Sequence, residues 1–97
     1  MSREKHTEHT QKEQSVEPDE IVRLIGTHTS EVLPELADHR FTASDELQEL
    51  GADSVDRAEI VSLVLESLSL DIPRAELFGT QNIGELAERL AGKLGDA

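Results

Sequence analysis

The sequence predicts an all-α protein, a four-helix bundle with a long loop after the first helix and a short third helix. Three observations lead to this fold class. Apolar residues recur every three or four positions in several segments, as along one face of an α-helix. No stretch alternates convincingly between apolar and polar residues, as a half-buried strand would. The 3 prolines lie where helical patterns start or stop, and 97 residues allow one compact domain.

The first helix is predicted to begin at Pro18 and to end before Pro34. Proline suits the first turn of a helix, and the acidic residues Asp19 and Glu20 that follow suit the positive end of its dipole. The apolar stripe of this helix consists of Ile21, Leu24, Ile25, His28 and Val32.

A long connection follows, from about Pro34 to Asp53. It exceeds the usual length of loops, so we expect a packed or functional loop that contains some helical turn. Its apolar anchors are Leu36, Phe41, Leu47 and Leu50.

The second helix is predicted to start near Asp53 and Ser54 and to run to about Leu68. One side is expected to carry Val55, Ala58, Val61, Leu65 and Leu68, widened by Ile60 and Val64. The acidic residues on or beside the opposite side are Asp56, Glu59 and Glu66.

Two further helices complete the bundle. Pro73 interrupts the pattern, so the segment from Arg74 to Phe78 has room for only a short helix. The last helix is predicted from Ile83 to Leu94, with Asn82 and Glu85 as a capping pair at its start. Its apolar stripe consists of Ile83, Leu86, Ala87, Leu90 and Leu94.

Residues 1–17 are predicted to form a flexible tail, and residues 18–97 the folded domain. Met1 and Val16 are the tail's only large apolar residues, too few to offset the entropy of ordering it. The formal net charge of −12 disfavours nucleic acids and anionic membranes and favours basic protein partners. With 0 cysteines and a charged N-terminus in place of an apolar signal segment, we expect a cytoplasmic protein.

The sequence offers little for catalysis, so we expect no enzyme and no metal site. His6 and His9 are spaced for a metal on a helix, but they lie in the predicted tail. Of the other two histidines, His28 and His39, the first is expected to be a stripe or boundary residue of the first helix rather than a ligand. Neither a glycine-rich phosphate loop nor a G-x-S-x-G motif occurs.

One run, from Leu50 to Asp56, carries more chemistry than its surroundings. Gly51 permits a turn before the second helix, and either Asp53 or Ser54 can cap its free N–H groups. Taken alone, an Asp-Ser pair at a helix start indicates ordinary capping. A serine hydroxyl there is also well placed to carry a phosphate ester, because the helix dipole favours an anion.

The run Leu50-Gly51-Ala52-Asp53-Ser54-Val55-Asp56, followed by Glu59-Ile60-Val61, resembles the attachment motif of acyl carrier proteins. The resemblance extends over about residues 18–95. It implies that Ser54 receives 4′-phosphopantetheine from coenzyme A through a phosphopantetheinyl transferase, with Asp53 assisting. The thiol of that arm then holds acyl groups as thioesters. Val55, Asp56 and Glu59 would belong to the recognition helix.

Within that family, several runs resemble the free-standing donor carriers of polyketide β-branching cassettes. They are Leu63-Val64-Leu65, Leu70-Asp71-Ile72-Pro73-Arg74-Ala75-Glu76-Leu77 and Asn82-Ile83-Gly84-Glu85-Leu86-Ala87. This resemblance implies a monomer that an acyltransferase loads with malonyl. A decarboxylating ketosynthase then produces acetyl, which a hydroxymethylglutaryl-synthase-like enzyme uses. The surface implied to distinguish this carrier from others consists of Val55, Asp56, Arg57, Arg74 and Phe78.

Two alternatives stay open at this point. One is a carrier for ordinary fatty-acid, polyketide or peptide chain extension. The other is a helical interaction module that is never modified, in which Ser54 is a plain cap. A small metal-binding or hydrolytic enzyme is a more distant third.

Overall fold

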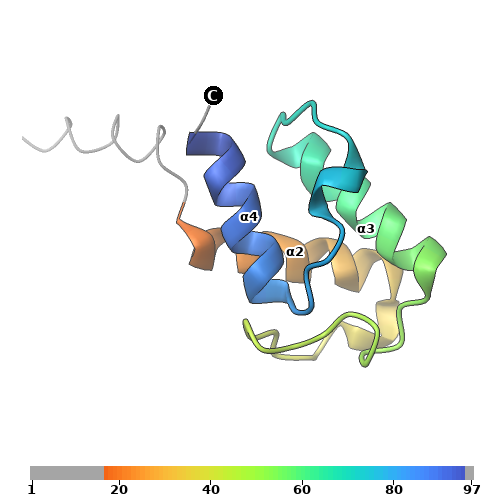
Figure 1. The fold of residues 1–97 in the computed structure, drawn as a ribbon. Helices are drawn as coiled ribbons and strands as arrows, with labels where there is room; N and C mark the ends of the chain where they lie inside the picture. The colour runs from red at the N-terminus through yellow and green to blue at the C-terminus, as the bar shows by residue number, and fades with distance from the viewer. Residues whose placement is uncertain (1–16, 96–97) are drawn as a thin grey trace, which may run out of the picture.

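The computed structural model describes residues 17–95, which are entirely helical apart from loops and turns (Figure 1). Three α-helices lie in this part of the chain: α2 (Pro18–Val32), α3 (Ser54–Ser67) and α4 (Ile83–Gly95). Two short 3-10 helices, η1 (Pro34–Leu36) and η2 (Arg74–Leu77), lie between them. The all-α prediction is therefore confirmed. Residues 1–16, with most of the predicted tail and its two histidines, lie outside the described residues.

The expected short third helix is the 3-10 helix η2 rather than an α-helix. Pro73 stands at its start in extended conformation, and Phe78 at its end is extended again. Four residues between these boundaries cannot propagate α-helical hydrogen bonds, so the tighter 3-10 turn forms instead. Three α-helices and η2 therefore stand where four helices were expected.

The core lies where α2 packs against both α3 and α4. Its fully buried side chains come from all three helices and include Ile21, Ile25, Ile60, Ile83 and Leu90. Among residues 17–95, no helix combines the length and the apolar character that crossing a membrane requires.

The face that α3 turns to the core agrees with the predicted stripe in part. Ile60, Val64 and Leu65 are the buried residues of this helix, whereas Val55 is 71% exposed. The pattern misled because α3 is apolar on two sides. Ala58 and Val61 line a cavity, and Val61 also packs against the edge of the core.

His28, predicted on the stripe of the first helix, is a polar link between α2 and α3. Its Nε2 lies 2.7 Å from Ser67 Oγ, and its Nδ1 lies 2.8 Å from Glu31 Oε1. Its side chain is only 13% exposed, and both ring nitrogens have partners.

The long loop is joined to the start of α4 by its backbone. Ile83 N–H donates to Asp45 O and Gly84 N–H donates to Ala43 O, both at 2.8 Å. These bonds satisfy two of the N–H groups that every helix start leaves without partners. The loop is thereby fixed as one wall of the bundle, in agreement with the prediction of a packed loop with some helical turn.

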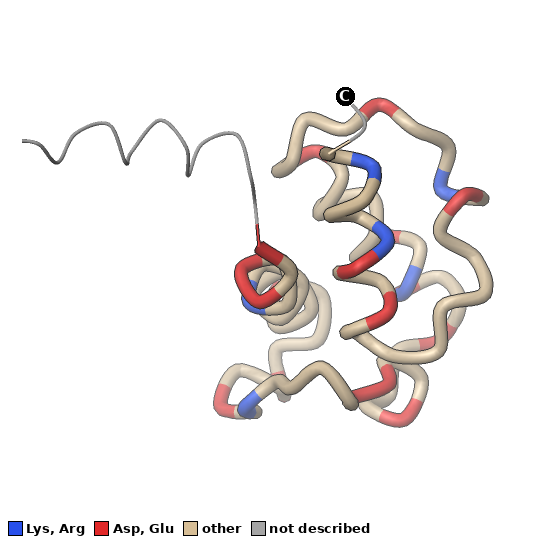
Figure 2. The backbone as a smooth tube through the Cα atoms, turned by 60° about the vertical axis from the view of Figure 1, so that its left-hand side comes forward, with Lys and Arg blue, Asp and Glu red and all other residues tan. Residues whose placement is uncertain are grey.

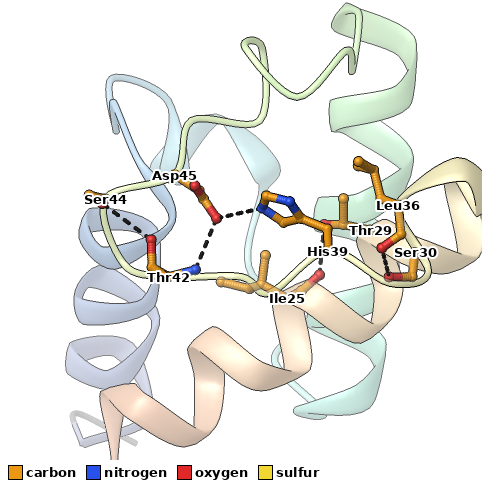
Figure 3. Close-up of polar contacts among 8 residues, drawn as sticks. All are labelled: Ile25, Thr29, Ser30, Leu36, His39, Thr42, Ser44 and Asp45. Carbon is orange, nitrogen blue, oxygen red and sulfur yellow. Dashed lines mark hydrogen bonds and ion pairs between the residues drawn. The ribbon is translucent and has the colours of Figure 1, made fainter.

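The Asp45 side chain organises the loop from within (Figure 3). Its Oδ2 accepts the Thr42 N–H and lies 2.9 Å from His39 Nε2. Burial raises the pKa of Asp45, but the His39 hydrogen bond, the Thr42 N–H and the His39 charge outweigh it. Together they hold this pKa below its ordinary value of 3.8. The stabilisation is complete above that value and is lost as the pH falls through the lowered pKa.

We predict that Gly84→Ala destabilises the fold, because a Cβ at this position would lie 2.8 Å from Ala43 Cβ and 3.0 Å from its carbonyl oxygen. Separating the loop backbone from α4 should cost about 1–3 kcal/mol. The matched control is Gly92→Ala in the same helix, where nothing lies within 4 Å of the added carbon. That change should stabilise the fold by up to about 1 kcal/mol. Urea denaturation measures both, and equal effects would contradict the close packing.

Candidate functional site

The start of α3 is set by a turn and a reciprocal cap. Gly51 has φ of +107°, a left-handed conformation that only glycine adopts easily. Ala52 then returns to the core, where it is 2% exposed. Asp53 Oδ1 accepts the Asp56 N–H at 2.8 Å, and Asp56 Oδ2 accepts the Asp53 N–H at 3.3 Å. This is a capping box with aspartate at both positions.

Ser54 is exposed and stands first in α3, directly after the cap. Because Asp53 is the capping residue, the Ser54 hydroxyl forms no hydrogen bond with any residue from 17 to 95. The sequence had left open which of the two residues caps. The result is a solvent-facing hydroxyl at the positive end of a helix.

A cavity of about 770 Å³ opens beside Ser54. Its walls come from the long loop, α3, η2 and the start of α4. Its apolar lining includes Leu47, Val61, Leu77 and Leu86, and its polar lining includes Gln48, Thr80 and Gln81. Ser54, Arg57, Arg74 and Phe78, all predicted as site residues, meet on this cavity.

The other predicted site residues lie outside the cavity lining. Asp53 and Asp56 are engaged in the capping box, and Glu59 is exposed on α3. Val55 and Phe78 are the large apolar side chains most open to solvent in residues 17–95, at 71% and 72% exposure. One follows Ser54 in α3, and the other lies just after η2.

Basic side chains link the η2 segment to both neighbouring helices, one from η2 itself and two from α4. Arg74 Nη1 donates to Ser62 Oγ of α3 at 3.2 Å. From α4, Arg89 Nη1 donates to Phe78 O at 2.8 Å, and Lys93 Nζ lies 2.6 Å from Glu76 Oε1. Sequence reasoning missed Arg89 and Lys93, because only the folded arrangement brings α4 beside η2.

The α4 start confirms the predicted Asn82 and Glu85 cap in part. Asn82 Oδ1 accepts the Glu85 N–H at 2.8 Å, as a capping residue should. The Glu85 carboxylate accepts the N–H of Gln81 rather than that of Asn82. The Glu85 side chain thus ties Gln81, which lines the cavity next to Thr80, to the first turn of α4.

The sequence matches a protein-family model described as "Phosphopantetheine attachment site" over residues 23–90. The chain belongs to this family. Its members are acyl carrier proteins, which are carriers rather than catalysts, and phosphopantetheine is their prosthetic group.

A similar protein of known role gives a more specific comparison than the family model does. The chain is 61% identical over 77 residues to the polyketide biosynthesis acyl-carrier protein AcpK of Bacillus subtilis (strain 168). The match covers 79% of this chain and 94% of the relative. The carrier family and its link to polyketide biosynthesis, inferred from short runs, are therefore confirmed.

The fold is also similar to one chain in a crystal structure of the curacin biosynthetic pathway HMG synthase in complex with acetyl donor-ACP. The TM-score is 0.77 at 47% sequence identity, over 79% of this chain and 99% of that chain. This likeness supports the β-branching subfamily over ordinary chain-extension carriers and over an unmodified helical module.

The residues present fit the family's prosthetic group. A phosphodiester on Ser54 would meet the N–H groups at the start of α3, because the side chain is exposed and free of other bonds. The adjoining cavity offers both apolar and hydrogen-bonding walls next to that hydroxyl.

We predict that removing the capping side chain of Asp53 destabilises the fold, whereas removing the hydroxyl of Ser54 does not. Asp53→Ala should lower the free energy of unfolding by about 1 kcal/mol, because it removes the side chain that caps α3. Ser54→Ala should change it by less than about 0.5 kcal/mol, as expected for an exposed residue without partners. Thermal or urea unfolding of the unmodified protein measures both. A larger loss for Ser54→Ala would mean that the hydroxyl is part of the cap.

Proposed function

We propose that this chain is the acetyl donor of a polyketide β-branching reaction. It would hold its acyl group as a thioester on a phosphopantetheine arm attached to Ser54. The observation that carries the proposal is the 47% identity and TM-score of 0.77 with a chain of the HMG synthase and acetyl donor-ACP complex. The free hydroxyl of Ser54 at the start of α3 supports the attachment point.

This role implies an order in which the partner enzymes would act. A phosphopantetheinyl transferase attaches the arm, with Asp53 beside the acceptor hydroxyl. An acyltransferase supplies malonyl, a decarboxylating ketosynthase leaves acetyl, and a hydroxymethylglutaryl-synthase-like enzyme takes the acetyl group. Because these enzymes and coenzyme A share one compartment, the proposed location is the cytoplasm. Residues 18–97 would act as the carrier unit, with η2 as the third helix of a four-helix carrier.

The docking surface for these partners would surround Ser54. Val55 and Phe78 supply exposed apolar contacts on two sides of it. Asp56 and Glu59 would supply negative charge, and Arg57 and Arg74 line the adjoining cavity. In a chain of net charge −12, such a surface favours basic partners and fast, salt-sensitive association.

We predict that Ser54 is the single attachment site. Incubation with coenzyme A and a broad-specificity transferase should add one phosphopantetheine to the intact mass of the wild-type protein. Ser54→Ala should abolish the added mass, whereas Ser44→Ala, which alters an exposed loop serine, should retain it. Retention of the added mass in Ser54→Ala would refute the attachment point.

We further predict that a synthase-like partner prefers this carrier. In competition, acetyl on this chain should be transferred much faster than acetyl on a fatty-acid carrier. Phe78→Ala should lower kcat/KM about tenfold by removing an exposed apolar contact. Glu59→Gln should weaken transfer at low salt, while Glu20→Gln, an exposed acid on α2, should not. Equal transfer from both carriers would favour the ordinary-carrier alternative.

A further inference from the structure

The lining of the cavity beside Ser54 contains more basic than acidic residues, although the chain as a whole is acidic. The protein has 21 acidic and 9 basic residues, and Figure 2 shows acidic positions distributed over the helices and the loop. Yet the cavity lining contains two arginines, Arg57 and Arg74, and one acid, Glu46. A cavity of net positive charge in an acidic protein is unexpected unless the cations have a partner.

Arg57 lines the cavity, and a backbone carbonyl holds its side chain in place. It lies one helical turn after Ser54, and its Nη1 donates to Ala52 O at 3.1 Å. Its side chain is partly buried rather than extended into solvent. A guanidinium has five N–H donors, so this single bond leaves most of them available.

Arg74 reaches the same wall of α3 from η2. Its Nη1 contacts Ala58 O at 3.5 Å and Ser62 Oγ at 3.2 Å, which lie about one and two turns further along the helix than Ser54. Neither arginine forms an ion pair with any carboxylate in residues 17–95. The carboxylates of Asp56, next to Arg57, and of Asp53 each accept the other residue's backbone N–H in the capping box.

From this arrangement we infer that Arg57 and Arg74 form an anion-binding pair for the cargo of this carrier. The ligand is the carboxylate of a malonyl-type acyl group, folded back into the cavity beside Ser54. The inference rests on the proposed attachment at Ser54. Guanidinium groups bind carboxylates through paired, charge-assisted hydrogen bonds, which a neutral acetyl group cannot form. The site would thus distinguish the malonyl-loaded carrier from the acetyl-loaded one.

The phosphodiester of the arm is a second source of the same anion chemistry. It would be fixed at Ser54, one turn from Arg57, whichever acyl group is present. The two sources therefore differ in their dependence on cargo. A carboxylate ligand acts only in the malonyl form, whereas a phosphodiester ligand acts in every form that carries the arm.

The test compares four forms of the full chain: unmodified, arm-loaded, acetyl-loaded and malonyl-loaded, each verified by intact mass. The probes are the arginine Nε–H signals in ¹H–¹⁵N NMR spectra, assigned with Arg57→Gln and Arg74→Gln. Arg23, exposed on α2 and outside this cavity, is the internal reference. Both cavity arginines should shift between the acetyl and malonyl forms, and Arg23 should not.

A second readout uses malonyl labelled with ¹³C at its carboxylate. Its signal should move between the wild-type protein and the Arg57→Gln/Arg74→Gln double variant, but not in Arg23→Gln. Circular dichroism verifies that each variant remains folded.

Each outcome has a distinct meaning. Arginine shifts specific to the malonyl form support a carboxylate site. Equal shifts in all arm-loaded forms support the anion pair and assign the phosphodiester as its ligand, which overturns the carboxylate assignment. Unchanged arginine signals across the four forms would mean that the arginines only brace α3 and η2, and would overturn the inference. Failure to load the arm appears in the mass spectrum first, and refutes the proposed function itself.

Discussion

Two backbone hydrogen bonds, from Ile83 N–H to Asp45 O and from Gly84 N–H to Ala43 O, hold the long loop against the start of α4. The site depends on this junction because the loop supplies one wall of the cavity and leads directly into the turn at Gly51. The junction needs no side chain on the α4 side, where Gly84 allows the loop backbone to approach closely. Within the loop, the Asp45 side chain bonds to His39 and to the Thr42 N–H, which reinforces the junction.

The second constraint is the double apolar character of α3. One side, with Ile60 and Val64, fills the core, and the other, with Val61, lines the cavity. A helix that packed on one side only would leave either the bundle or the cavity without a wall. The Asp53 cap completes this arrangement, because it fixes the helix start without using the Ser54 hydroxyl.

Helix positions followed from the sequence because periodicity and proline report on local structure. Pro18 begins α2, and Ile83 begins α4, as expected. Periodicity alone did not give the exposed position of Val55 or the cavity position of Arg57, because they depend on where the loop and η2 lie relative to α3. Periodicity cannot show which of two apolar sides faces the core. The Asp53-Ser54 motif could be recognised in the sequence because its residues are adjacent. The cavity could not, because its walls come from segments that are far apart in the sequence.

We propose that a synthase-like partner docks on the surface around Ser54, formed by the start of α3 and by η2. Its apolar contacts would be the exposed side chains of Val55 and Phe78, and its acids would favour a basic partner. Amide hydrogen exchange of the acetyl-loaded chain, with and without the synthase-like enzyme, tests this most directly. We expect added protection at the start of α3 and around η2, with α2 unchanged. Protection centred on α2, with none around Ser54, would contradict it.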